Sequence, residues 1–194
     1  MDMIVASGNP GKIREYRDIL SPLGFEVFSC TEKGVVPDVE ETGATFEENA
    51  LLKARAVYQA LRTDVIADDS GLEVTALGGE PGIYSARYKG LQTEHERRMA
   101  ILDGLRNAAD RSARFVCCIC HIDAEGSETL FKGVWNGTIA MREDGVNGFG
   151  YDPIFISEDS GGRTTASLPI SFKERYSHRA KAVKMLTAHL NGRG

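Results

Sequence analysis

The stretch Val65-Ile66-Ala67-Asp68-Asp69-Ser70-Gly71 decides how this chain folds. Its three apolar residues predict a short buried strand, and two carboxylates follow where that strand is expected to end. Carboxylates at the C-terminal end of a strand lie where α/β sheets bind ligands. Successive strand residues point to opposite faces, so if both aspartates stay in strand geometry, only one of Asp68 and Asp69 can face a given site. Such acids suit Mg²⁺, which leaves most of its shell to water and phosphate, although a solvated Asp-Ser-Gly turn would use the same residues.

The segments before this stretch alternate between short apolar strands and amphipathic helices. Strands are predicted over 3–6 and 25–28, separated by a helix over 12–20. A second helix begins after Thr45, because Thr45 and Glu48 match the T-x-x-E capping box and an apolar stripe follows. The resulting β-α-β-α-β order indicates an α/β fold.

The second half of the chain has a different pattern. Two apolar strands joined by a short polar turn predict an antiparallel pair, so we expect a mixed sheet rather than an all-parallel one. The expected elements are a helix over 94–107, strands over 113–122 and 128–134, further strands over 136–141 and 154–156, and a closing helix over 177–190.

Composition places the chain among ordinary globular proteins. Its 194 residues suffice for one domain, which we expect to span residues 1–194. The net charge of −5 argues against a nucleic-acid partner, because such proteins usually carry a basic face. No apolar run is long enough to span a bilayer, so we expect no membrane partner.

The cysteines and the N-terminal sequence indicate a compartment. The four cysteines lack the spacing of a zinc site, and we expect them to be reduced and buried. They are Cys30, Cys117, Cys118 and Cys120. Reduced thiols, together with no visible export signal, favour a cytoplasmic location.

A polar loop follows the first predicted strand and leads into a helix. It comprises Ser7, Gly8, Asn9, Pro10, Gly11 and Lys12. Exposed amides and the helix dipole at such a junction favour an anion, and Lys12 adds a positive charge. The spacing does not match the Walker A pattern. The loop therefore predicts phosphate binding, with a plain strand-turn-helix connection as the alternative.

Acidic and polar residues precede and line the second helix. Asn49 and Lys53 are four residues apart and so share one helix face. Together with Asp69 and the loop acids Glu40 and Glu41, they would form a metal-plus-phosphate site. The alternative is that the two glutamates are simply solvated loop acids.

Two clusters in the last third of the chain suit a nucleotide base. Phe149 and Tyr151 lie on a glycine-rich loop and can stack on a base, and Asp152 can accept hydrogen bonds from ring N–H groups. Later side chains can bind phosphate or donate to a carbonyl oxygen. These are Lys173, His178 and Arg179. A tight turn and a capped helix N-terminus would use the same residues.

Six segments, taken in order, resemble the non-canonical purine nucleoside triphosphate pyrophosphatases, the inosine/xanthosine triphosphatase family. They are ASGNPGK (6–12), EETGATFEENALLKA (40–54), IADDSGLEV (66–74), LGGEPGIYSARY (77–88), GFGYDPIF (148–155) and SHRAKA (177–182). Each is weak alone, but all six in order over nearly the whole chain are specific. The stretch ASLPIS (166–171) departs from the family pattern, because it lacks an acidic residue after the alanine.

The resemblance implies an elongated, two-lobed α/β fold in which helices flank a long central mixed sheet, and it implies a homodimer. It also implies that Asp69 is the catalytic carboxylate and that Glu40 or Glu41 joins Asp69 at Mg²⁺. The implied substrate contacts are Ser7, Gly8, Asn9, Pro10, Gly11, Lys12, Asn49, Lys53, Ser70, Phe149, Gly150, Tyr151, Asp152, Lys173, His178 and Arg179.

The expected reaction is Mg²⁺-dependent hydrolysis of ITP, dITP and XTP to the nucleoside monophosphate and pyrophosphate, which removes deaminated purines from the nucleotide pool. One alternative is a septum-inhibitor-type (Maf-like) pyrophosphatase that acts on other modified nucleotides. Another is a nucleotide sensor that binds without hydrolysing. The GFGYD and SHR segments favour the purine family over the first alternative, and the intact acidic residues argue against the second.

Overall fold

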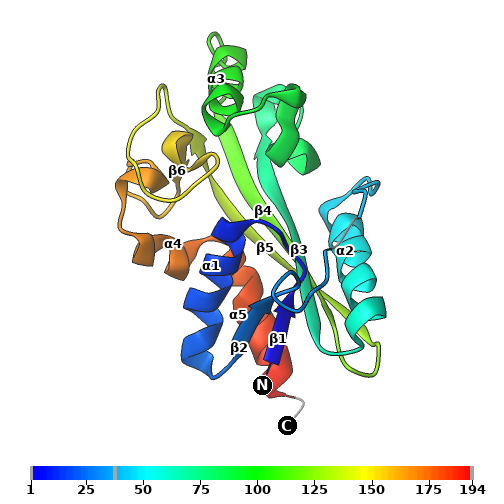
Figure 1. Ribbon diagram of the computed structural model, residues 1–194. Helices are drawn as coiled ribbons and strands as arrows, with labels where there is room; N and C mark the ends of the chain where they lie inside the picture. Colours follow the sequence, from blue (N-terminus) through cyan, green and yellow to red (C-terminus); the bar gives the residue numbers. More distant parts are fainter. Residues whose placement is uncertain (1, 37–38, 193–194) are drawn as a thin grey trace. The chain divides into compact units, whose positions relative to one another are not determined.

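The computed structural model describes residues 2–36 and 39–192, and in this part of the chain six strands form one mixed sheet flanked by helices (Figure 1). The strands lie in the order β2-β1-β3-β4-β5-β6. β1 is parallel to β2 and β3, whereas β5 is antiparallel to β6. These pairings confirm the predicted mixed α/β sheet. The strands are β1 (Asp2–Val5), β2 (Glu26–Ser29), β3 (Val65–Val74), β4 (Ser112–Ile122), β5 (Glu128–Ile139) and β6 (Phe155–Ser157).

The α-helices are α1 (Pro10–Leu20), α2 (Phe46–Leu61), α3 (Glu94–Gly104), α4 (Ile170–Tyr176) and α5 (His178–Asn191). Short 3₁₀ turns separate several of them: η1 (Ser21–Leu23), η2 (Thr75–Leu77), η3 (Gly82–Gly90), η4 (Asp152–Ile154) and η5 (Thr165–Ser167). No helix in the described residues is long and apolar enough to cross a membrane.

One predicted strand is wrong. The segment 136–141 is not a separate strand, because β5 continues through Trp135 to Ile139. The polar residue and glycine at 136–137 suggested a break, but Gly137 pairs with Ser157 of β6. A Cβ atom at position 137 would lie 2.3 Å from the Ile156 carbonyl oxygen, so this glycine allows the two strands to approach.

The helix starts follow side-chain capping. Thr45 Oγ1 accepts from the Glu48 amide, as the T-x-x-E pattern predicts. The predicted reciprocal bond differs, because Glu48 accepts from the Ala44 amide instead of the Thr45 amide. A complete capping box occurs at α3 between Thr93 and Glu96, where the sequence analysis did not predict one.

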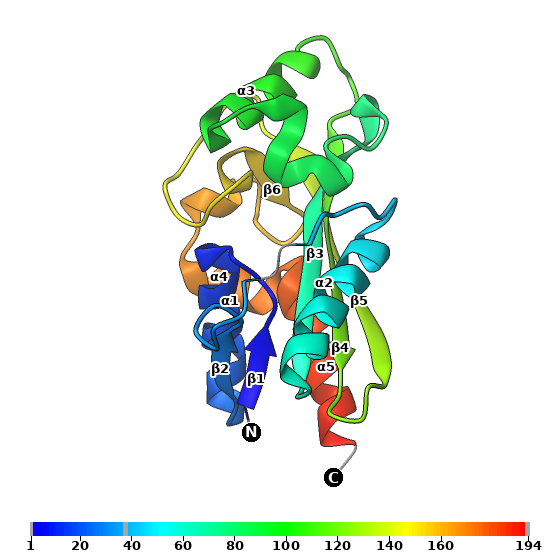
Figure 2. The same cartoon turned by 45° about the vertical axis from the view of Figure 1, so that its right-hand side comes forward.

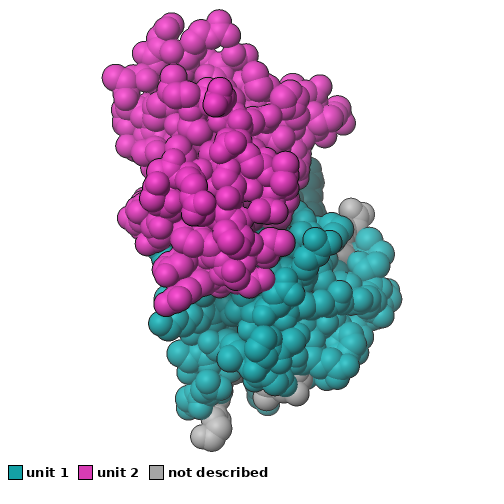
Figure 3. All heavy atoms as spheres, turned by 90° about the vertical axis from the view of Figure 1, so that its left-hand side faces the viewer, with its two compact units in different colours: residues 1–69, 117–133, 179–194 teal, residues 70–116, 134–178 magenta. Residues whose placement is uncertain are grey.

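The chain divides into two compact units (Figure 3). Unit 1 comprises residues 1–69, 117–133 and 179–194, and unit 2 comprises residues 70–116 and 134–178. Strands β3, β4 and β5 each contribute residues to both units.

Unit 1 has apolar cores on both faces of its sheet. On one face, Ile13 and Tyr16 of α1 pack with Val183 of α5 against the strands. On the other face, residues of α2 pack against the strands, among them Ala50 and Val57. Figures 1 and 2 show α1 and α2 on opposite sides of β1. Side chains that alternate along the unit 1 part of β3 therefore meet different helices.

Unit 2 is built around an aromatic core. The Phe155 ring makes an edge contact with Phe115 at 4.6 Å between centroids and packs against Trp135 at 5.5 Å. Tyr151 belongs to the same cluster. Across the chain, the four cysteines are free and buried, as predicted.

Candidate active site

The two aspartates of β3 point to opposite faces of the sheet. The Asp68 carboxylate lies 3.0 Å from Lys12 Nζ, and the Asp69 carboxylate lies 2.9 Å from Lys53 Nζ. Lys12 belongs to α1 and Lys53 to α2. This arrangement confirms the predicted alternation. The predicted strand end is wrong, because β3 continues through both aspartates to Val74. Each buried carboxylate has a cationic partner on its own face, so both are tolerated within a continuous strand.

Lys53 of α2 contacts two carboxylates, one in the loop before α2 and one in β3. Its Nζ lies 2.9 Å from Asp69 Oδ1 and 2.8 Å from Glu41 Oε1. Burial alone would lower the pKa of Lys53, but the charges of Asp69, Asp68 and Glu41 outweigh it, so the pKa is raised. Lys53 therefore stays protonated and holds two carboxylates near one point.

Asp69 is costly to ionise where it lies. Burial raises its pKa, and the positive charges of Lys53 and Lys12 offset only part of that shift. A carboxylate in this condition is stabilised by any further cation and takes up a proton more readily than an exposed one.

Glu41 and Asp69 could bind a divalent cation only if other ligands completed its coordination shell. The described residues contain no group of three or more His, Cys, Asp or Glu side chains arranged to hold a metal. Glu41 and Asp69 supply two carboxylates, which is the number Mg²⁺ takes when phosphate and water fill the remaining positions. Glu40 is exposed on the same loop. The residues present are thus compatible with Mg²⁺ bound together with a phosphorylated ligand.

Asn49 makes hydrogen bonds both to Asp69 and to the loop that contains Glu41. Its side chain is wholly buried, donates to Asp69 Oδ2 at 3.4 Å and accepts from the Gly43 amide at 2.8 Å. A Cβ atom at position 43 would lie 2.6 Å from Asn49 Oδ1. Asn49 and Lys53 share one helix face, as predicted, and that face meets Asp69.

The predicted phosphate loop forms the start of α1. Asn9 caps the helix, and its Oδ1 accepts from the amides of Gly11 at 2.9 Å and Lys12 at 3.3 Å. Ser7 Oγ accepts from the Asn9 amide at 3.2 Å. A phosphate at this N-terminus would therefore compete with the Asn9 side chain for the same donors.

Behind the phosphate loop lies a buried ionic cluster that the sequence analysis did not predict. Arg179 Nη2 lies 3.2 Å from Asp68 Oδ2, and Arg179 also pairs with Glu15. Burial lowers the pKa of Arg179 to about 10. The sequence predicts Arg179 as a base contact, whereas in unit 1 its guanidinium contacts two carboxylates.

In unit 2, the predicted base loop is held by Asp152. Its Oδ2 accepts from the Phe149 amide at 2.9 Å and from Lys173 Nζ at 2.7 Å. The same ammonium lies 4.1 Å from the centroid of the Phe149 ring. Gly148 has a φ of +78°, and a Cβ atom there would meet Asp152 Oδ2 at 2.1 Å, so this turn requires glycine. Three predicted contact residues thus come together.

Tyr151 is buried in this structure, and its role as a base contact stays a prediction. Its ring is buried in the unit 2 core, and its hydroxyl donates to the Ser85 carbonyl at 2.8 Å. Phe149 is half-buried, so it is the ring of this pair that retains surface for stacking. His178 is also buried, and its ring stacks on Phe115 with centroids 4.8 Å apart. Ser70 is half-buried in the unit 2 part of β3.

The sequence matches a known protein family over nearly its whole length. Residues 3–189 match the Ham1 family. The chain belongs to this family. It is 46% identical over 191 residues to a dITP/XTP pyrophosphatase of Bacillus subtilis, covering 96% of this chain and 95% of the relative. A dITP/XTP pyrophosphatase of Exiguobacterium sp. is 44% identical over 191 residues, with coverage of 98% and 97%.

Solved structures agree. The Ham1 protein of Staphylococcus aureus matches with a TM-score of 0.89 and 45% identity, and the match covers 100% of both chains. These matches confirm the resemblance that the six sequence segments carry.

Proposed function

We propose that this chain hydrolyses the non-canonical purine nucleoside triphosphates ITP, dITP and XTP to the nucleoside monophosphate and pyrophosphate. Full-length similarity to enzymes named dITP/XTP pyrophosphatase supports the reaction class. The observation that carries the proposal is the buried cluster in which Lys53 contacts both Asp69 and Glu41.

The residues of unit 1 suit the chemistry. Asp69 is proposed as the acceptor of a proton from the attacking water, because burial raises its pKa toward the range useful to a general base. Water attacks the α-phosphorus, the bond to the bridging oxygen breaks, and pyrophosphate leaves. Lys12 and Lys53 would offset charge on the triphosphate and on the leaving group.

Mg²⁺ is the proposed cofactor. Glu41 and Asp69 would hold it, with Glu40 as the neighbouring alternative ligand. When bound, the ion neutralises charge on the phosphates.

The base is proposed to bind in unit 2. The Phe149 ring, held by Lys173 and Asp152, would stack on the purine. Tyr151 and His178 would support this region from the core that they occupy. Following the family resemblance, we further propose that the protein acts as a homodimer in the cytoplasm, without a nucleic-acid or membrane partner.

A turnover assay tests the proposal against its alternatives. Purified protein is incubated with ITP, XTP, dITP and ATP, with Mg²⁺ or with chelator, and the products are identified by chromatography. We expect monophosphate and pyrophosphate from the first three substrates in Mg²⁺ and none in chelator. Orthophosphate with a diphosphate would refute attack at the α-phosphorus. Binding without turnover would indicate a sensor, and turnover of a modified pyrimidine triphosphate, tested in parallel, in preference to these purines would indicate the septum-inhibitor type.

A further inference from the structure

An arginine of helix α3 spans the loop that carries Phe149. Arg98 Nε donates to Glu143 Oε1 at 2.5 Å, and Arg98 Nη1 donates to the Gly150 carbonyl at 2.8 Å. Glu143 lies before Phe149 in the loop and Gly150 follows it directly. All of these residues belong to unit 2. One side chain thus contacts the loop on both sides of the ring.

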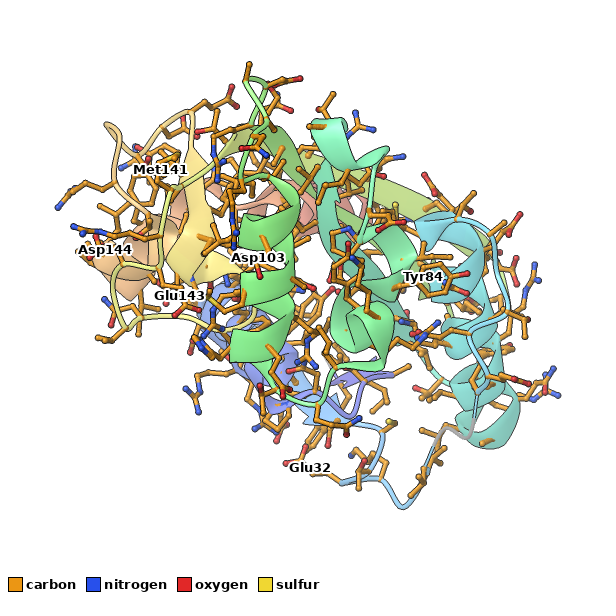
Figure 4. All side chains as sticks on the ribbon, turned by 90° about the horizontal axis from the view of Figure 1, so that it is seen from above. Glu32, Tyr84, Asp103, Met141, Glu143 and Asp144 are labelled. Atoms are coloured by element: carbon orange, nitrogen blue, oxygen red, sulfur yellow. The ribbon has the colours of Figure 1, made fainter. Side chains whose placement is uncertain are left out.

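The surroundings of Arg98 favour a fixed position. Its side chain is only 13% exposed, and Glu94, one helical turn earlier, lies 3.6 Å from Nη1. Glu143 also accepts from His95 at 3.1 Å. In Figure 4, Glu143 lies beside α3, and Asp144 lies farther from that helix on the same loop. Burial would raise the pKa of Glu143, but hydrogen bonds from Arg98 and His95 outweigh it and lower the pKa, so the carboxylate stays charged.

The loop needs such contacts because its own backbone is permissive. Gly145, Gly148 and Gly150 all have positive φ angles, which glycine adopts without strain but also leaves without strain. Elsewhere the loop is held by the Ala166 carbonyl, which accepts from the amides of Val146 and Asn147. Asp152 holds the loop at the Phe149 amide, and Arg98 adds a side chain that contacts the loop both before and after the ring.

We propose that Arg98 is a positioning residue for base binding, acting through Glu143 and Gly150 on the Phe149 loop. This inference rests on the proposed function, which assigns base stacking to Phe149. The planar guanidinium suits the role, since its fixed fork can donate to a carboxylate and a carbonyl in different directions. A lysine has a single ammonium at this point and cannot reproduce the fork.

Loss of Arg98 should weaken base binding and leave phosphate chemistry intact. The residues proposed to bind phosphate and to catalyse hydrolysis, Lys12, Lys53 and Asp69, all belong to unit 1. Loss of two hydrogen bonds made by a charged donor predicts a rise in KM for ITP of roughly tenfold or more. We expect kcat to change by less than about twofold, because the variant removes binding that is shared by ground and transition states.

The test compares Arg98→Met with Arg106→Met. Arg106 lies just beyond α3 and pairs with the exposed Asp103 at 2.7 Å, so its replacement controls for loss of a surface arginine. Inhibition constants for the two products distinguish an effect on base binding from an effect on phosphate binding. In Arg98→Met the inhibition constant for IMP should rise together with the KM for ITP, whereas the inhibition constant for pyrophosphate should not change. Arg98→Lys should resemble Arg98→Met more than the unaltered protein. Amide hydrogen exchange over 143–150 should accelerate in Arg98→Met and not in Arg106→Met.

Two outcomes would overturn the proposal. One is an unchanged KM and unchanged hydrogen exchange in Arg98→Met. The other is an equal rise of the IMP and pyrophosphate inhibition constants, which would indicate general loss of structure. Failure of the proposed function looks different, because the unaltered protein would then release no pyrophosphate from ITP. In that case the exchange of residues 143–150 still decides whether Arg98 holds the loop.

Discussion

Replacing Asp69 with asparagine should separate catalysis from stability. Asn keeps the shape of the side chain and can still contact Lys53, but it cannot accept a proton or provide a full negative charge. Because a positioned general base contributes about 10²–10⁴-fold, we expect turnover of ITP to fall by at least about 10²-fold. Asp69→Asn should nevertheless fold normally.

The expected sign of the stability change follows from the pKa of Asp69. Burial raises this pKa, so the folded state binds a proton more tightly than the unfolded state does. The ionised carboxylate therefore costs stability, and the cost develops as the pH rises from the unfolded value, about 3.9, through the higher folded value. Asparagine carries no such penalty. We expect Asp69→Asn to be at least as stable as the unaltered protein at pH 7, and its relative advantage to shrink toward pH 4.

Urea unfolding from pH 4 to 7, in chelator and in parallel with ITP turnover at pH 7, measures both effects. Chelator is needed because a cation bound to the carboxylate would stabilise the folded state. The reasoning would be refuted by near-normal turnover, which would remove Asp69 from the mechanism. A large loss of stability at pH 7 would equally refute it, because Asp69 would then be a structural residue whose pairing with Lys53 outweighs its burial.

Three further changes have expected outcomes. Arg179→Met should destabilise the protein by about 3–5 kcal/mol in urea unfolding, because it removes the buried guanidinium that pairs with Glu15 and Asp68 and leaves Asp68 with Lys12; a loss under about 1 kcal/mol would contradict this. Gly43→Ala should lower kcat/KM for ITP with little change in Tm, since the added methyl meets Asn49 Oδ1 and displaces the acidic loop; an unchanged kcat/KM would argue against a role for that loop. ITP should be preferred to ATP by roughly 10²–10⁴-fold in kcat/KM, because any donor that pairs with the 6-keto oxygen of ITP would be left unpaired by the 6-amino group of ATP; equal rates would refute recognition of the base through its 6-substituent.

Elements of the fold were predictable from sequence where apolar periodicity and helix capping determine them without help from tertiary contacts. The apolar periodicity of residues 12–20 and 46–61, with Thr45 as the cap, predicted α1 and α2 closely. The two errors in strand length have a common cause. Polar residues and glycines were taken as breaks, yet β3 continues through Asp68 and Asp69, and β5 continues through Gly137. Tertiary partners, namely lysines for the aspartates and β6 for the glycine, overrode the local signal.

The candidate site was predictable by residue type but not by contact. The spacing of Asn49 and Lys53 placed both on one helix face, and strand alternation placed Asp68 and Asp69 on opposite faces. The pattern could not show that Arg179 pairs with Asp68, because those residues are far apart in the sequence and only the packing of α5 brings them together. Residue types suited to a nucleotide thus also serve to neutralise one another within the protein.

Asp68 and Asp69 point to opposite faces of the sheet, so the charged groups around the two carboxylates differ. Asp68 lies between Lys12 and Arg179, so its charge is compensated on both sides within the folded chain. Asp69 and Glu41 both contact Lys53. A divalent cation would neutralise negative charge of these two carboxylates. The burial that raises the pKa of Asp69 acts in the same direction, because it makes the ionised carboxylate costly and its pairing with a further cation favourable. Of the two adjacent aspartates, Asp69 is therefore the one that we propose as a ligand of the metal.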